Sequence, residues 1–170
     1  MQTFLPYKCF KESAKVLDRL RLGKQRVEGM QLLGVLSKGP RELVWRVVND
    51  SPVQIERNTP WFNHPAVKMW RGCELSLLEY VLAVATEWCS RGYQDTCAAK
   101  LLAMDSSKWG SATPDWLGDP QFHAAHRSNL LRKDTVWYSK FGWTEPNDLP
   151  YIWPAPAVIP VHMLEEAVDS

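Results

Sequence analysis

The stretch Arg21-Leu22-Gly23-Lys24-Gln25-Arg26-Val27-Glu28 decides how the first part of the chain folds. It places three cations, an amide and a carboxylate within about two helical turns. Apolar or small residues recur there at steps of three or four, which predicts one helix from about Lys11 to Leu36. The expected core face consists of Val16, Leu20, Gly23, Val27, Met30 and Gly34. The opposite polar stripe consists of Asp18, Arg21, Gln25 and Glu28, with Lys24 beside it.

The polar stripe has two interpretations. It could bind an anion and hold a carboxylate beside it, or it could be a solvated helix face with charge pairs. Gly23 does not decide between them. A glycine inside a helix costs about 1 kcal/mol relative to alanine, but close packing of another element explains Gly23 as well as a ligand would. Support for a functional site must therefore come from other parts of the chain.

Length and composition limit the class of protein. The 170 residues are 45% hydrophobic and 23% charged, which predicts one globular domain with a sizeable core. No stretch reaches the roughly 18 uninterrupted apolar residues of a membrane span, and the N-terminus lacks the order of a secretory signal. We therefore expect a cytoplasmic protein that does not bind a membrane. The cysteines show no CxxC spacing, so we expect reduced thiols, no structural metal and no cofactor.

Charge is unevenly distributed along the chain, although the formal net charge is only +1. Residues 1–46 contain ten Lys or Arg and four Asp or Glu, whereas residues 141–170 contain five acidic residues and no Lys or Arg. A basic pole on a near-neutral protein suits a focused polyanion site better than a general nucleic-acid coat. Nine tryptophans also leave room for one or two that stack or wedge against a ligand.

Periodicity and helix breakers predict a mainly α protein, a compact single-domain helical bundle with an extended Pro-rich C-terminal tail. After the first helix, we expect a short basic helix between Pro40 and Asn49. A long central helix should follow, capped by Asn63 or His64 and ended by Arg91-Gly92. Two further helices are expected at about Thr96–Met104 and from Asp119 to about Lys133.

Three features of the chain are similar to a known family: the polar first helix, Asn63-His64-Pro65 heading a helix that closes with Arg91-Gly92-Tyr93, and Trp137-Tyr138-Ser139-Lys140-Phe141-Gly142. On these features the chain resembles the pyrimidine-dimer DNA glycosylases of the phage UV-repair endonuclease type. The resemblance covers residues 1–153 and implies a glycosylase-like helical domain there. An extended acidic tail over residues 154–170 is expected to follow.

The resemblance also implies a chemistry. In the family, the N-terminal amine attacks the sugar carbon that carries the damaged base, and a glutamate of the first helix assists. Matching the family's helix at Leu22 brings Glu28 onto that glutamate. Gln2 is too bulky to favour removal of Met1, so the expected amine is that of Met1. Lys24 either supplies an alternative amine or binds a phosphate.

The implied function is a DNA glycosylase, with or without AP-lyase activity, that excises a damaged or modified pyrimidine from duplex DNA by nucleotide flipping. The alternatives are a non-catalytic module that recognises distorted or modified DNA, and a helical domain whose basic pole binds a protein. We expect a monomer. The catalytic candidates are Met1, Glu28 and Lys24. The expected DNA-binding residues are Arg21, Gln25, Arg26, His64, His126, Arg127, Asn129, Trp137, Tyr138 and Lys140.

Two of these assignments have structural alternatives. His64 could act only as a helix cap, and the aromatic residues from Trp137 to Trp143 could belong to the core. Trp61 is a further candidate for stacking on an unstacked base. His123 and His126 lie three residues apart on one helix face, but without a third ligand we expect hydrogen bonds or a phosphate contact there, not a metal.

Overall fold

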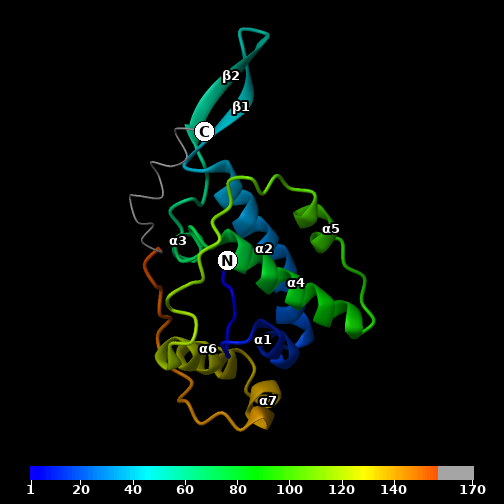
Figure 1. The fold of residues 1–170 in the computed structure, drawn as a ribbon, viewed down its shortest axis with the longest axis vertical. Helices are drawn as coiled ribbons and strands as arrows, with labels where there is room; N and C mark the ends of the chain where they lie inside the picture. Colours follow the sequence, from blue (N-terminus) through cyan, green and yellow to red (C-terminus); the bar gives the residue numbers. More distant parts are fainter. Residues whose placement is uncertain (157–170) are drawn as a thin grey trace.

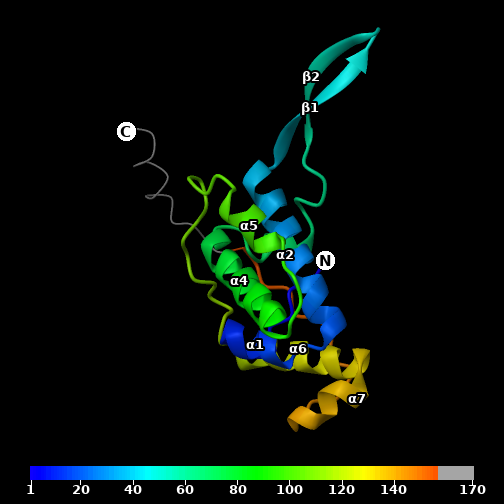
Figure 2. The ribbon, with the colours of Figure 1, turned by 90° about the vertical axis from the view of Figure 1, so that its right-hand side faces the viewer.

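The structure, a computed structural model, describes residues 1–156. Its elements are α1 (Phe10–Val16), α2 (Arg19–Lys38), β1 (Arg41–Val48), β2 (Ser51–Asn58), α3 (Pro65–Lys68), α4 (Glu74–Ser90), α5 (Cys97–Leu102), α6 (Pro120–Lys133), α7 (Thr135–Tyr138) and the 3-10 turn η1 (Ser139–Phe141). Helices α2 and α4 pack together at the centre, with α1, α6 and α7 at one end of the molecule and the β-hairpin at the other (Figures 1 and 2). Within the described residues, no helix is long and apolar enough to cross a membrane.

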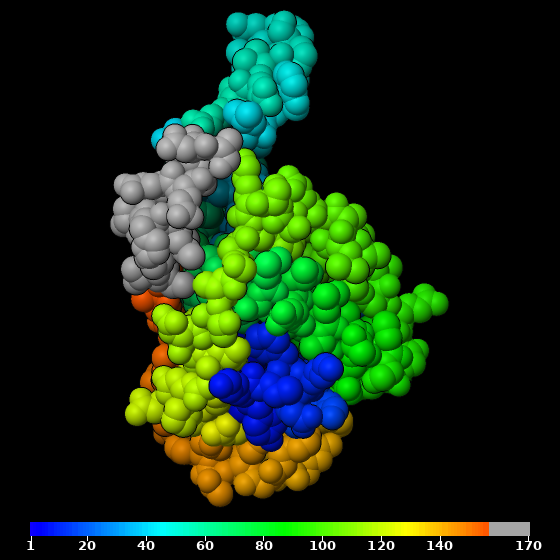
Figure 3. Space-filling view, in the orientation of Figure 1, coloured from blue at the N-terminus to red at the C-terminus, as the bar shows by residue number. Residues whose placement is uncertain are grey.

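The expectation of a mainly α bundle is wrong, because the fold is a mixture of α and β structure. Residues 41–48, expected to form a short helix, are strand β1, which pairs antiparallel with β2 from Arg41↔Asn58 to Val48↔Ser51. Asn49 and Asp50 join the strands with φ angles of 50° and 60°, the left-handed conformation that a two-residue hairpin turn requires. The β-branched residues of both strands favour this extended conformation. Figure 3 shows the hairpin projecting from the body of the molecule.

The long helix expected from Lys11 to Leu36 is also wrong, because the chain forms two helices there. Leu17 is extended, with a ψ of 135°. The carboxylate of Asp18 then caps α2 by accepting the N–H groups of Leu20 and Arg21 at 2.9 and 3.1 Å. The break between α1 and α2 lets α2 take its own orientation relative to the core.

The buried face of α2 differs from the expected one. Leu20 and Val27, expected in the core, are 61% and 39% exposed. The residues of α2 that are buried are Leu22, Gln25, Gly29, Leu32 and Leu33. A polar residue in the middle of this face hides it from a search for apolar periodicity.

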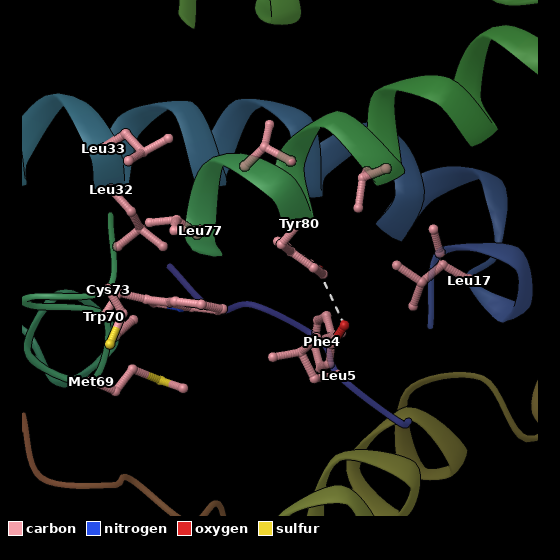
Figure 4. Close-up of a cluster of buried hydrophobic side chains, with 14 of the residues drawn as sticks. Phe4, Leu5, Leu17, Leu32, Leu33, Met69, Trp70, Cys73, Leu77 and Tyr80 are labelled. Atoms are coloured by element: carbon pink, nitrogen blue, oxygen red, sulfur yellow. Dashed lines mark hydrogen bonds between the residues drawn. The ribbon is translucent and has the colours of Figure 1, made fainter. Parts of the chain in front are cut away.

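The N-terminal segment runs through the core before the first helix begins. Thr3, Phe4 and Leu5 are buried, and Figure 4 shows Phe4 and Leu5 beside Tyr80 of α4. The Tyr80 hydroxyl donates a hydrogen bond to the Phe4 carbonyl at 3.1 Å. Because this segment is enclosed by packing, the direction in which the chain terminus emerges is fixed.

The later helices agree better with the sequence. His64 caps α3, with its Nδ1 atom accepting the Ala66 N–H at 3.1 Å. The chain then turns at Gly72, with φ of 80°, so the long central helix is divided into α3 and α4. Asp119 caps α6, as its place before Pro120 predicts. Residues 142–156 form no helix or strand, and the acidic tail expected over 154–170 lies outside the described residues from position 157 onward.

Candidate active site

Gln25 fastens the N-terminal segment to α2. Its side-chain oxygen accepts the Phe4 N–H at 2.8 Å, and its Nε2 atom donates to the Gln2 carbonyl at 2.8 Å. The Tyr80 hydroxyl lies 2.6 Å from the same side-chain oxygen. These contacts pair buried backbone groups that would otherwise lack partners. The terminus is therefore held against α2 by hydrogen bonds as well as by packing.

Two histidines of α6 hold the next residue of the segment. His126 Nδ1 accepts the Leu5 N–H at 3.2 Å, and His123 Nδ1 donates to the Leu5 carbonyl at 2.7 Å. Burial lowers the pKa of His126 to about 3. The imidazole of His126 is therefore neutral near pH 7, as its role of acceptor for an N–H requires.

Glu28 lies next to the chain terminus. Its Oε2 atom accepts the Gln2 N–H at 3.1 Å, and Gln25 Nε2 lies 3.3 Å from the same oxygen. Residues 25 and 28 are separated by one turn of α2, so both side chains reach the N-terminal segment. The carboxylate is consequently one residue away from the amine of Met1.

A pocket of about 210 Å³ surrounds this pair of groups. It is lined by Met1, Gln2, Phe4, Leu20, Arg21, Lys24, Glu28, Lys133 and Tyr151. Lys24 also lines a wider groove of about 800 Å³ along α2, in which Trp137 takes part. An amine, a carboxylate and three cationic side chains therefore meet around one hollow. Among the described residues, no group of three or more His, Cys, Asp or Glu side chains is placed to hold a metal ion.

The structure thus brings Met1, Arg21, Lys24 and Glu28 together, as a shared site requires. Arg21 is oriented by Asp18, whose Oδ2 atom lies 2.7 Å from Arg21 Nη1. Lys24 is exposed. At Arg21, Lys24 and Glu28, the polar stripe expected on α2 therefore lines a pocket instead of an open helix face.

Four expected DNA-binding residues lie in the interior and are no more than 1% exposed: Gln25, His126, Asn129 and Tyr138. Each has a partner inside the fold. The Asn129 amide donates to the Leu149 carbonyl at 3.1 Å, and the Tyr138 hydroxyl donates to Asp18 Oδ2 at 2.6 Å. A side chain without surface cannot contact a nucleic acid, so the expected role of these four residues is corrected to holding the site together.

Two expected phosphate ligands are also occupied within the fold. Arg26 pairs with Asp95 and lies over the Trp88 ring, 4.3 Å from its centroid. Arg127 contacts Glu145 at 2.6 Å and donates to the Pro6 carbonyl at 2.7 Å. Their side chains are only 13% and 20% exposed. These guanidinium groups join segments of the chain, and their expected contacts to phosphates stay predictions.

The remaining expected DNA contacts lie at the surface. Trp137 is half-buried and donates from Nε1 to the Val16 carbonyl at 2.8 Å, with one edge in the groove along α2. The exposed Lys140 places its Nζ atom 3.2 Å from the centroid of the Trp137 ring. Together with the helix cap His64, these residues keep a surface that a nucleic acid could reach.

Sequence reasoning missed two residues of the pocket, Lys133 and Tyr151. Lys133 ends α6, and Tyr151 belongs to the irregular segment that follows η1. Both are more than 100 residues from Met1 along the chain. No local spacing connects them to the N-terminus, and only the tertiary fold brings them there.

The geometry defines a class of site in which a chain amine and a carboxylate meet beside cations, as amine chemistry on an anionic polymer needs. The family model for pyrimidine dimer DNA glycosylase matches residues 1–101, more than half of the chain. The chain therefore belongs to the pyrimidine dimer DNA glycosylase family. Membership supports a function in DNA repair as a glycosylase, with DNA as the substrate. Comparisons with curated proteins and with solved structures gave no match.

Proposed function

We propose that this protein excises a damaged or modified pyrimidine from duplex DNA, with the amine of Met1 as the nucleophile and Glu28 as the assisting carboxylate. The observation that carries the proposal is the hydrogen bond of 3.1 Å from the Gln2 N–H to Glu28 Oε2. It fixes a carboxylate within one residue of the chain amine. An amine nucleophile and a nearby group that accepts protons are what a covalent glycosylase reaction needs.

The reaction begins when the neutral Met1 amine attacks C1′ of the damaged nucleotide. The bond between C1′ and the base breaks, and the base leaves with the electron pair of that bond and takes a proton from water. Opening of the sugar ring at O4′ then gives a Schiff base between the amine nitrogen and C1′. The Glu28 carboxylate stabilises the positive charge that develops on the sugar, accepts the proton that the amine loses and passes it to O4′ as the ring opens. Glu28 is then again a carboxylate.

Strand cleavage follows from the same intermediate. A Schiff base at C1′ makes the proton on C2′ acidic, and Glu28 accepts the N–H of the residue next to the amine. Loss of that proton to Glu28 breaks the C3′–O bond and releases the phosphate end of the strand. We therefore include AP-lyase activity in the proposal.

The cations of the pocket suit the phosphates on either side of the damaged nucleotide. Lys24 and Lys133 are exposed, and Arg21 is oriented by Asp18. Contacts to phosphates position a duplex without reading its sequence. The amine reaches C1′ only if the duplex opens locally, so the proposal includes extrusion of a nucleotide. We propose a monomer as the active form.

The test is incubation with duplex DNA that carries one cyclobutane pyrimidine dimer, with and without borohydride, and undamaged duplex of the same sequence as control. We expect cleavage of the glycosidic bond and a borohydride-dependent covalent adduct with the damaged duplex only. Cleavage without an adduct would replace the amine by water as the nucleophile. Binding without cleavage would contradict the enzymatic proposal and favour a DNA-binding module.

A further inference from the structure

Four aromatic rings form a row beside Met1. Their order is Trp61, His64, Trp153 and Tyr151, with successive centroids 5.5, 6.2 and 5.7 Å apart. Trp61 and His64 lie between β2 and α3, whereas the other two belong to the end of the described chain. Figure 1 shows this orange-red end passing close to α3. The row therefore joins two distant parts of the sequence, and we name it the aromatic row.

The aromatic row borders Met1 at two hollows. Trp61 shares with Met1 a hollow of about 440 Å³, and Tyr151 lines the 210 Å³ pocket that holds Met1 and Glu28. The pKa of His64 is lowered by burial and then by the positive charge of the Met1 amine. The charge of the amine therefore disfavours protonation of His64.

Trp61 is held outward by the structure around it. The residue is 61% exposed, and its φ of 66° lies in the left-handed region that bulky residues rarely adopt. The Trp61 carbonyl accepts the His64 N–H at 2.8 Å. The Arg71 guanidinium lies 4.2 Å from the centroid of the Phe62 ring and donates to the Phe62 carbonyl at 3.1 Å. Such a conformation persists only where the surrounding contacts impose it, as they do in this loop.

Exposed aromatic rings suit either a protein partner or a nucleobase. The position beside the amine favours the nucleobase, because this chain belongs to a family of DNA glycosylases and the amine must reach a sugar. Bases stack on aromatic side chains with little regard to sequence, because every base has a flat π face. An extruded nucleotide also needs a surface that replaces the stacking it has lost.

We propose that Trp61, His64, Trp153 and Tyr151 form a binding site for an unstacked nucleobase of the DNA substrate. The placement of this site rests on the proposed function, because it assumes that the sugar of a bound nucleotide reaches the Met1 amine. The cations of α2 and α6 then hold phosphates while the aromatic row holds the base. The two kinds of contact differ in their response to salt, since only phosphate contacts release counterions.

The test compares Trp61→Ala and Trp153→Ala with Trp45→Ala, which removes an exposed tryptophan from the hairpin. Trp45 is 70% exposed and lies on β1, outside the hollows that contain Met1. The probe is a duplex with 2-aminopurine next to a cyclobutane pyrimidine dimer. The dissociation constant and the fluorescence of the bound probe are measured at several salt concentrations, with the melting temperature as a check of folding.

We expect Trp61→Ala and Trp153→Ala each to weaken binding by about 5- to 100-fold, the range that loss of one stacked base gives. The slope of affinity against salt should not change, and the bound 2-aminopurine should become brighter because it is no longer quenched by stacking. Trp61→Phe should restore most of the affinity, because it keeps an aromatic ring. Lys24→Ala should instead reduce the salt slope.

Unchanged affinity and unchanged quenching in both tryptophan variants would overturn the inference, as would an equal loss in Trp45→Ala. If Trp61→Ala does not fold, Trp153→Ala and Trp61→Phe decide the outcome. The borohydride adduct of the wild-type protein separates this inference from the proposed function. An adduct together with unaffected tryptophan variants removes the base site alone, whereas quenching without adduct or cleavage removes the proposed chemistry alone.

Discussion

Gln25 and Glu28 are one turn apart on α2 and have different tasks. Gln25 is buried and uses its amide to hold the backbone of Gln2 and Phe4. Glu28 lines the pocket and presents its carboxylate beside the terminus. One turn of α2 therefore provides both the amide that holds the N-terminal segment in place and the carboxylate that faces the pocket. Their three-residue spacing was visible in the sequence, but the division of roles was not, because it depends on which face of α2 is buried.

Replacement of Glu28 by glutamine tests the role of its charge. Glutamine keeps an oxygen that can accept the Gln2 N–H, so the fold and DNA affinity should be preserved. We expect the single-turnover rate of glycosidic-bond cleavage to fall by roughly 10²- to 10⁴-fold, as for loss of a general base. Glu12→Gln is the matched control, because Glu12 is an exposed carboxylate of α1 that pairs with Lys15. Equal rates for Glu28→Gln and Glu12→Gln would remove Glu28 from the mechanism.

His126 makes the stability of the protein depend on pH. Its pKa is about 3 in the folded protein and about 6.5 in an unfolded chain. The unfolded state therefore binds the extra proton, and the free energy of unfolding falls as the pH drops from about 6.5 toward 3. Urea denaturation at pH 6.5 and pH 5 should show a loss that is larger by roughly 1–2 kcal/mol than in His126→Gln, which cannot be protonated.

The pKa values of His64 and His123 are lowered as well. Both residues remain in His126→Gln, so their contributions cancel when the two proteins are compared. An identical pH dependence of wild type and variant would show that His126 is not the group responsible. The expected loss also has a functional meaning, because a protonated His126 can no longer accept the Leu5 N–H that fixes the N-terminal segment.

Helices α2 and α4 are in close contact at Gly29. A Cβ atom at position 29 would lie 2.3 Å from Val81 Cγ2, whereas one at Gly34 would meet no atom within 4 Å. We expect Gly29→Ala to lower the free energy of unfolding by about 1–3 kcal/mol, as overpacking does. Gly34→Ala should raise it by up to about 1 kcal/mol, because alanine is the better helix former. Urea denaturation of the two variants measures both changes.

The contradicting result is similar stability of the two variants, which would mean that α2 and α4 are not packed as described. Val81→Ala in combination with Gly29→Ala adds a second check. The smaller side chain makes room for the new methyl group, so the double variant should lose less than the sum of the single losses.

Elements with strong end signals could be predicted from the sequence. Asp119-Pro120 marked the start of α6, and His64-Pro65 marked the start of α3. The hairpin could not, because Val44, Val47 and Val48 have a spacing that fits a helix as well as a strand. What decides is the pairing of residues 41–48 with residues 51–58 across the turn. The paired residues lie on either side of the turn at Asn49 and Asp50, and a search for helices interprets that turn as the end of a helix.

At the scale of the whole molecule, the site is assembled from both ends of the described chain. Met1 meets Lys133 of α6 and Tyr151 of the final segment around one pocket. Local spacing and the family resemblance indicated the α2 part of this site. The α6 part depends on tertiary contacts across more than 100 residues, and the aromatic row depends on the contact of His64 with Trp153, 89 residues later. Local spacing in a single sequence does not indicate such contacts.

This arrangement makes the chain terminus itself part of the site. Two residues added before Met1 would replace the amine by an amide at that position, while the same residues added after Ser170 leave it free. We expect the N-terminal extension to abolish the borohydride adduct and the C-terminal extension to have no effect. DNA affinity should change little in either protein, because the phosphate-binding side chains are untouched. Full adduct formation by the N-terminally extended protein would contradict a role of the Met1 amine.

In the proposed reaction the Met1 amine forms the bond to DNA, and peptide mapping of the borohydride-reduced adduct shows which amine reacts. After proteolysis and nuclease digestion, mass spectrometry locates the sugar remnant on the chain. We predict that the remnant lies on the nitrogen of Met1. A remnant on Lys24 or Lys133, the two lysines that line the pocket, would contradict the claim and assign the nucleophile to α2 or α6.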